Sequence, residues 1–190
     1  SRNAKGGLAV DNVLTIAEER LNLFAHMANS ACGLSLWCFG MKKQLYTCTC
    51  PAEKEFRLFL DLGQCLDYAI AHGPESHAPI LMSDPIGMLW VAECVWHGDD
   101  ASYLVILGPV FDAAASLQTL QNCLHGMNLS VSLTATIMEK LEQVPILPLS
   151  TLHQYIKMLH WVLYEETLDV GSIRLQNRSN IIPDKDKSPY

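Results

Sequence analysis

The first part of the chain carries the hydrophobic pattern of an amphipathic helix. Over 8–30, apolar residues recur every three or four positions, and the charged run Glu18–Arg20 falls between them. That spacing puts the apolar side chains on one face of a helix. Gly33 is its predicted end, because glycine readily takes the left-handed conformation that closes many helices.

Apolar runs further along the chain predict two β-hairpins. The first pairs 34–39 with 44–49, and the second pairs 86–96 with 102–111. Alternate positions of 86–96 form two largely apolar sets, which is typical of a central strand covered on both sides. We expect Pro109 to end the second pairing, because proline has no amide hydrogen. The two sets are Met88, Trp90, Ala92, Cys94 and Trp96 on one face, and Leu89, Val91, Glu93 and Val95 on the other.

Helical spacing returns between and after the hairpins. One helix is predicted over 51–72, where the Gly73-Pro74 pair ends it. The last predicted helix carries an apolar stripe that includes Leu152 and Leu159. The helices after the second hairpin are predicted at 115–125, at 131–143 with Ser130 as its cap, and at 151–168 with Ser150 as its cap.

Hairpins separated by helices predict an α+β fold, in which helices flank an antiparallel sheet and a helical segment follows it. We expect residues 1–7 to be an N-terminal extension and 8–171 to be one domain. The polar sequence of 172–190 predicts a linker or a frayed tail. A sheet that is covered on both faces can enclose a small-molecule cavity near its middle.

Composition limits the classes of function. The 190 residues are 49% hydrophobic and 17% charged, which excludes a collagen, a coiled coil and a disordered chain. The net charge of −7 argues against nucleic-acid binding by this segment, since phosphates require clustered lysine and arginine. No apolar run reaches the roughly 20 residues of a membrane span. Seven cysteines without a preceding secretory signal are expected to be reduced thiols in the cytoplasm.

Three segments share their pattern with a known family. They are HAPILMSDPIG at 77–87 with Trp90 after it, LVILGPVF at 104–111, and the Pro-x-Leu-Pro stretch at 145–148 before a long aromatic-rich helix. They resemble the N-terminal sensor domains of AraC-type bacterial transcription regulators. The resemblance implies a PAS/GAF-like fold and a small-molecule effector, with DNA bound only through a C-terminal helix-turn-helix part outside this chain.

Aromatic residues gather on the predicted strands and suggest a ligand site. A buried tryptophan needs a partner for its indole N–H, and aromatics beside a carboxylate suit a small aromatic or cationic ligand. Core filling is the alternative explanation. In a regular strand Glu93 faces away from Trp90, so both line one cavity only if a bulge intervenes. The predicted ligand-binding residues are Trp37, Phe39, Met88, Trp90, Glu93 and Tyr103.

Metal and haem sites stay open as alternatives. The Cys48-Thr49-Cys50 segment could supply two zinc ligands, and Cys123 with His125 has similar spacing, although no Cys-x-x-Cys pair is present. The Cys50-Pro51 dipeptide could supply a haem thiolate. Either His72 or His77 could then be the second haem ligand. His153 and His160 are expected to be surface or interface residues of the last helix.

Catalytic motifs are missing from the sequence. It contains no Gly-x-Ser-x-Gly, no P-loop and no Gly-x-Gly-x-x-Gly. We therefore predict a non-enzymatic, cytoplasmic, small-molecule-sensing domain of a bacterial transcription regulator, with no cofactor or metal. A ligand-free dimerisation or interaction domain is the second hypothesis. The predicted homodimer contact lies on the last helix, through Leu152, Tyr155, Leu159 and Val162.

Overall fold

The computed structural model describes residues 4–176, with side chains from residue 18 onward. Residues 177–190 of the predicted tail and residues 1–3 of the predicted N-terminal extension therefore lie outside the described residues. The helices are α1 (Ala4–Cys32), α2 (Glu53–Leu62), α3 (Cys65–His72), α4 (Leu117–His125), α5 (Val131–Leu141) and α6 (Leu149–Tyr164). The strands are β1 (Leu36–Gly40), β2 (Leu45–Cys48), β3 (Ile80–Ser83), β4 (Leu89–His97), β5 (Asp100–Val110) and β6 (Arg174–Leu175).

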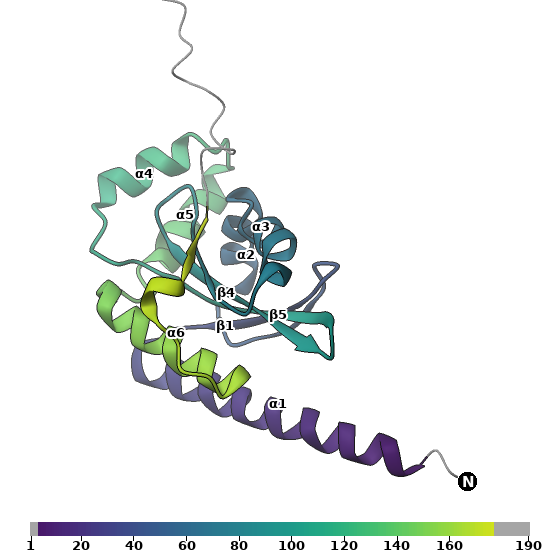
Figure 1. Ribbon diagram of the computed structural model, residues 1–190. Coiled ribbons are helices and arrows are strands. Elements are labelled where there is room, and N and C mark those ends of the chain that lie inside the picture. Colours follow the sequence, from purple (N-terminus) through teal and green to yellow (C-terminus); the bar gives the residue numbers. More distant parts are fainter. Residues whose placement is uncertain (1–3, 177–190) are drawn as a thin grey trace, which may run out of the picture.

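The strands form one sheet in the order β2-β1-β5-β4-β3-β6 (Figure 1). All neighbouring strands are antiparallel except β6, which runs parallel to β3. The two longest strands, β4 and β5, lie at the centre and form the second predicted hairpin. The predicted α+β fold of PAS/GAF-like type is confirmed.

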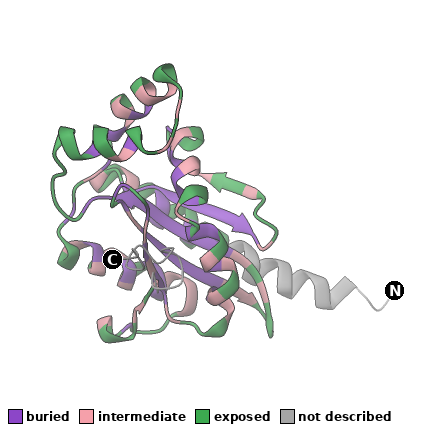
Figure 2. Ribbon diagram, turned by 90° about the horizontal axis from the view of Figure 1, so that it is seen from above, coloured by how far each residue is buried: buried purple, intermediate pink, exposed green. Residues whose placement is uncertain are grey.

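Helices cover both faces of the sheet, and the sheet between them is mostly buried (Figures 1 and 2). On one face α1 and α6 pack side by side, and buried Phe24 and Leu159 belong to their shared core. On the other face lie α2, α3, α4 and α5, which contribute buried residues such as Phe59, Leu66 and Ile137. The domain therefore has two hydrophobic cores, one on each side of the sheet.

The alternation predicted for β4 is confirmed. Met88, Trp90, Ala92 and Cys94 belong to the core beneath α2–α5, whereas Val91 belongs to the core beneath α1 and α6. Two other predicted features are also confirmed. The end of α1 is closed by Gly33, whose φ is +75° and whose N–H donates to Asn29. The hydroxyl of Ser130 caps α5 by accepting from the Leu133 N–H.

The single helix predicted over 51–72 is wrong, because the structure divides it into α2 and α3. Gln64 takes the left-handed conformation at a φ of 55° and precedes α3. A Cβ at Gly63 would lie 3.1 Å from Asp84, so the backbone comes close to the turn after β3 at this point. The break lets two short helices follow the curved sheet. Ser150 does not cap α6 either, since that helix begins at Leu149 after Pro148.

Two short strands were not predicted. β3 lies within the segment 77–87, and β6 lies in the predicted linker, so the described domain continues beyond Gly171. Arg174 explains why the chain returns to the sheet: its guanidinium donates to the carbonyls of His72, Gly73, Ser76 and Ala78. Five hydrogen bonds from this one side chain anchor β6 beside β3.

Pro109 does not end the pairing of β5, which continues to Val110 opposite Leu89. The Gly108-Pro109 peptide bond is cis, and Gly108 has a φ of +139°. A Cβ at Gly108 would lie 2.8 Å from the ring of Trp90 and 2.9 Å from the Leu89 carbonyl oxygen. Only glycine fits this close approach between the two central strands.

Among the described residues, no helix combines the length and the apolar character needed to cross a membrane.

Candidate functional site

Four of the predicted ligand-binding residues meet in the core beneath α2–α5. Trp37 stacks on Phe39 with ring centroids 6.1 Å apart and contacts Trp90 edge to face at 5.8 Å. Met88 belongs to the same cluster, and all four side chains are completely buried. These four predicted residues do lie together in the structure. Their role in binding a ligand stays a prediction.

Each buried indole in this cluster has a hydrogen-bond acceptor. The Trp37 N–H donates to the Gly108 carbonyl at 2.8 Å, and the Trp90 N–H donates to Asp84 Oδ2 at 2.9 Å. Asp84 Oδ1 accepts from the N–H groups of Ile86 and Met88. Asp84 therefore closes the turn before β4, and the same carboxylate also fixes the orientation of Trp90.

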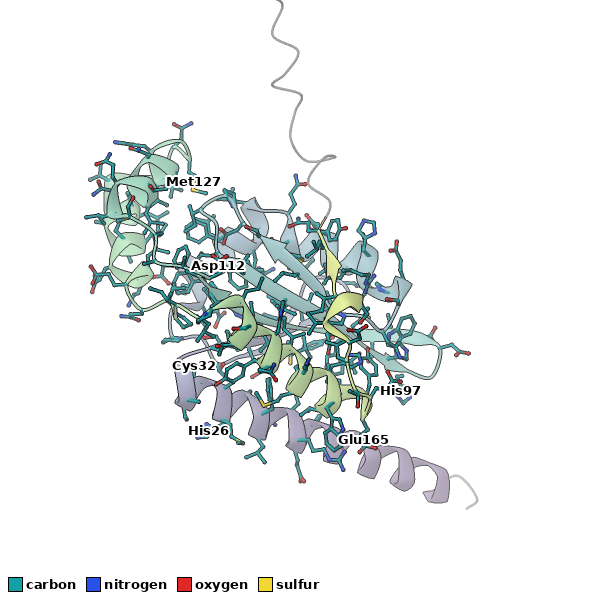
Figure 3. The ribbon with its side chains drawn as sticks, turned by 60° about the vertical axis from the view of Figure 1, so that its left-hand side comes forward. His26, Cys32, His97, Asp112, Met127 and Glu165 are labelled. Atoms are coloured by element: carbon teal, nitrogen blue, oxygen red, sulfur yellow. The ribbon has the colours of Figure 1, made fainter. Side chains whose placement is uncertain are left out.

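An apolar cavity of about 210 Å³ opens between the end of β5 and the α4–α5 hairpin. Phe111, Leu120, Leu141 and Val144 line it and also belong to the core that contains Trp37. Figure 3 shows that the chain leaves the sheet at Asp112, which is labelled, and that the hairpin projects from the sheet around labelled Met127. The cavity therefore lies at the edge of the core that contains the aromatic cluster, although none of the four clustered side chains lines it.

The other two predicted ligand-binding residues, Glu93 and Tyr103, are separated from that cluster by the sheet. Tyr103 lines an open groove of about 470 Å³ together with Glu18 and Tyr46. Burial, with Cys38 and Glu18 nearby, raises the pKa of Tyr103 to about 12. The β4–β5 pairing is irregular between Leu89 and Val91, but Glu93 still faces α6 on the side opposite Trp90, so the six residues do not line one cavity.

Glu93 instead forms a buried pair with His160 of α6. The distance from Glu93 Oε1 to His160 Nδ1 is 2.6 Å, and the two residues are 1% and 3% exposed. Glu93 lies in the middle of central strand β4, whereas His160 lies on the face of α6 toward the sheet. One charge-assisted hydrogen bond thus joins the centre of the sheet to the last helix.

A second group of side chains surrounds this pair at the end of α6. Glu166 Oε2 lies 3.5 Å from His160 Nε2. Tyr164 donates its hydroxyl to the Cys94 carbonyl, and the ring of His77 stacks on Tyr164 at 4.5 Å. Next to them, Glu165 pairs with Arg20 of α1, and Figure 3 shows labelled Glu165 beside that helix. The C-terminal end of α6 is therefore fixed to β4, to α1 and to the loop before β3.

The electrostatics of the pair follow from burial and proximity. Burial raises the pKa of Glu93, although its hydrogen bond to His160 opposes that shift. The hydrogen bond to Glu93 raises the pKa of His160, and the nearby Glu166 raises it further. Glu93 Oε2 has no hydrogen-bond partner in the described part of the chain. The site therefore satisfies only one of the two carboxylate oxygens of Glu93.

Stability alone does not account for such a pair. Removing two charges from water costs several kcal/mol, and well-packed apolar residues often replace a buried ion pair at no loss of stability. What a buried pair does confer is a defined position for the two elements that it joins. Here it defines the position of α6 relative to β4.

Glu93 was among the residues predicted from the sequence, but its partner His160 was not. His160 was expected on the surface or at an interface, and this expectation is wrong because the side chain is buried. The sequence did contain a pattern that indicates the burial of His160. His160 follows Leu152 and Ile156 at intervals of four residues, which places it on the same buried face of the helix.

The residues predicted to form a homodimer contact pack inside the domain instead. Leu152 and Leu159 are 0% exposed and pack in the core beneath α1 and α6 of the same chain. Tyr155 and Val162 are partly buried against the same core. The apolar stripe of α6 therefore stabilises the domain itself, because an amphipathic helix buries this face first against its own sheet.

The candidate metal ligands do not assemble into a larger site. Among the described residues, no three His, Cys, Asp or Glu side chains are grouped so that they could hold a metal ion. His72 pairs with Glu75, and His77 stacks on Tyr164. Cys50 is buried at the junction between β2 and α2, where its neighbours are Cys48 and Ser35.

Comparison with known proteins gives no relative: no family model, no curated protein and no solved structure matches this chain.

Proposed function

We propose that this chain is a non-enzymatic regulatory domain that binds a small molecule and transmits binding through α6. The buried Glu93–His160 pair carries this proposal. It links the central strand directly to the last helix, so a displacement of β4 is passed to α6 through this contact.

The position of the cavity supports a ligand on the opposite face of the sheet. Its lining residues Phe111, Leu120 and Val144 are part of the same packed cluster as Trp37 and Trp90. Trp90 and Glu93 lie close together on β4 but face opposite sides of the sheet. A ligand that moves the aromatic cluster therefore acts on β4, and β4 holds the pair that positions α6.

The chemistry of the cavity limits its ligand. Glu142 is the charged residue in an otherwise apolar lining, and the volume of about 210 Å³ is smaller than the roughly 300–1,000 Å³ of sites for drug-sized ligands. A small, mainly apolar or aromatic molecule fits these features.

The proposal also includes the kind of protein to which this domain belongs. The sequence resemblance supports a cytoplasmic, homodimeric, bacterial transcription regulator of AraC type, in which the DNA-binding helices belong to a further domain outside this chain. The PAS/GAF-like fold agrees with a sensory role, but a fold by itself does not determine function.

A screen of small aromatic and aliphatic metabolites by thermal shift tests ligand binding. A ligand at a hundredfold excess over its Kd stabilises by about 2.7 kcal/mol, which raises the Tm by about 5–10 °C in a domain of this size. Val144→Phe fills the cavity, so we expect this variant to lose the shift. Val131→Phe is the matched control, because Val131 lies on the same hairpin and is 88% exposed.

Hydrogen exchange then tests transmission. With ligand bound, we expect altered amide exchange in α6 of the wild-type chain and no such change in the Val144→Phe variant. A library without any stabilising compound, together with a purified chain of unliganded mass, would count against sensing. Ligand binding that leaves the exchange of α6 unchanged would contradict the relay.

A further inference from the structure

Two cysteines lie together at the junction of β2 and α2, on a segment that the proposed sensing function does not use. Cys48 is the last residue of β2, and Cys50 precedes the first turn of α2. The N–H of Cys50 donates to Cys48 Sγ at 3.2 Å, and the two thiols are hydrogen-bonded to each other. Both sulfur atoms therefore lie on the same side of this short connection.

The surroundings of Cys50 stabilise a thiolate. The Cys48 thiol, the Ala52 N–H and the Ser35 hydroxyl lie beside its sulfur and favour its ionised form. Ala52 is the N-cap of α2, so the positive end of the helix dipole adds to this effect. Together they lower the pKa of Cys50 to about 7, although burial and Glu53 oppose the shift.

Other cysteines of the domain have a different environment. Burial raises the pKa of Cys38 and of Cys94 to about 11, and each lies within the sheet. Cys48 also has a raised pKa, because its thiol donates its proton toward Cys50. The segment thus places a sulfur that ionises easily beside a second thiol, and the hold of Cys50 on the Cys48 proton ends once Cys50 is oxidised.

A small cavity leads to Cys50. It has a volume of about 140 Å³, and Ser35, Phe56 and Pro109 are among its other lining residues. Exposed Gly33 and Gln143 on its rim open it to solvent. The volume equals only a few water molecules at about 30 Å³ each, so it admits hydrogen peroxide but excludes a peptide disulfide such as oxidised glutathione.

We propose that Cys50 and Cys48 form a peroxide-reactive dithiol that closes to a disulfide. The Cys50 thiolate attacks one peroxide oxygen, the O–O bond breaks, and hydroxide leaves and takes up a proton to give water. Cys50 is then a sulfenic acid. The Cys48 sulfur attacks the Cys50 sulfur, the S–O bond breaks, and the departing hydroxide combines with the Cys48 proton as a second water. Both cysteines are oxidised, and the peroxide is reduced.

Peptide mass spectrometry tests this step. The folded chain is treated briefly with hydrogen peroxide, alkylated and then digested with trypsin. Trypsin releases Gln44–Lys54, which contains Cys48 and Cys50 and no other cysteine. We expect this peptide to lose two hydrogen atoms and to escape alkylation. About half of Cys50 is thiolate at pH 7, against a few per cent for an ordinary thiol, so we expect its oxidation to be about tenfold faster than that of free cysteine.

Two variants separate the roles of the sulfur atoms. In Cys48→Ser, we expect Cys50 to stop at the sulfenic acid, which dimedone traps. In Cys50→Ser, the fast oxidation disappears from the peptide. Cys123→Ser is the matched control, since this partly exposed cysteine lies on α4 and its loss leaves the rate unchanged. Melting curves of the reduced variants establish that each is folded.

Three results would overturn the proposal. The first is a Gln44–Lys54 peptide that keeps two alkylatable thiols while Cys123 is oxidised. The second is an absence of dimedone adduct on Cys50 in the folded Cys48→Ser variant. The third is oxidation of the pair by oxidised glutathione as fast as by peroxide, because the size of the cavity forbids it.

Discussion

Glu93→Ala is expected to lower the free energy of unfolding by about 3–5 kcal/mol, the usual cost of removing one partner from a buried ion pair. His160 would then stay buried against β4 with its Nδ1 unpaired. His160→Ala should cost a similar amount, because it leaves the Glu93 carboxylate without its hydrogen-bond donor. Urea or guanidinium denaturation of the purified chain measures both values.

Two further variants show whether the loss comes from the broken pair. Glu93→Met combined with His160→Leu removes both charges and keeps apolar volume, so we expect it to recover most of the stability. Glu166→Ala removes an exposed carboxylate near the same histidine and should cost less than about 1 kcal/mol. Single variants as stable as the wild type would mean that the pair does not hold α6 to the sheet.

Asp84→Ala is the second substitution with a large expected effect, a loss of about 3–5 kcal/mol. Asp84 is 2% exposed and accepts hydrogen bonds from the N–H groups of Ile86, Met88 and Trp90. Each buried donor left without an acceptor costs about 1–3 kcal/mol. Thermal and chemical denaturation measure the loss, and a blue or red shift of tryptophan emission reports the changed environment of Trp90.

Conservative and distant variants complete that experiment. Asp84→Asn keeps one carbonyl oxygen as an acceptor, so we expect a loss about half as large. Asp112→Ala removes an exposed carboxylate after β5 and should change stability by less than about 0.5 kcal/mol. An Asp84→Ala variant no less stable than Asp112→Ala would contradict the role of this carboxylate as the acceptor that organises the β3–β4 turn.

Local patterns in the sequence were enough to predict most of the sheet and helices. The alternation along 86–96 identified β4 as a central strand and assigned its two faces correctly, because side chains in a strand must alternate. Gly33 and Ser130 marked helix ends for reasons that are equally local. These features depend on neighbours within a few residues, so a single sequence contains the information.

Long-range contacts account for what the sequence did not predict. β6 is two residues long and is held by Arg174, whose bonds reach carbonyls about a hundred residues earlier in the chain. β3 is only four residues long, too short to show a clear alternating pattern of its own. The break between α2 and α3 follows from the close approach of Gly63 to Asp84. The hydrophobic periodicity of a single segment contains no information about contacts with distant segments.

The candidate site was predicted only in part for the same reason. Trp37 and Trp90 were correctly assigned to strands of two separate hairpins, but the β1–β5 pairing that brings them together was not predicted. Glu93 was recognised as an unusual carboxylate on an apolar strand, but its partner is 67 residues away along the chain. Only the packing of α6 over β4 brings His160 to it.

The pair also makes stability depend on pH in a defined direction. Glu93 and Glu166 raise the pKa of His160 above its unfolded value of about 6.5. A raised folded pKa contributes stability that is fully present below about pH 6.5 and is lost as the pH rises through the folded pKa. Tyr164 and His77, the other titratable groups around α6 at this point, lie near the same site.

The pKa of His160 itself tests the central claim, that a buried charge pair sets the position of α6. Nuclear magnetic resonance of the imidazole nitrogen atoms measures it in the wild-type chain and in Glu93→Gln. Burial alone lowers a histidine pKa, whereas the carboxylate raises it. We predict a value above about 6.5 in the wild type and a lower one in Glu93→Gln. A wild-type value at or below about 6.5, or the same value in both chains, would contradict the account.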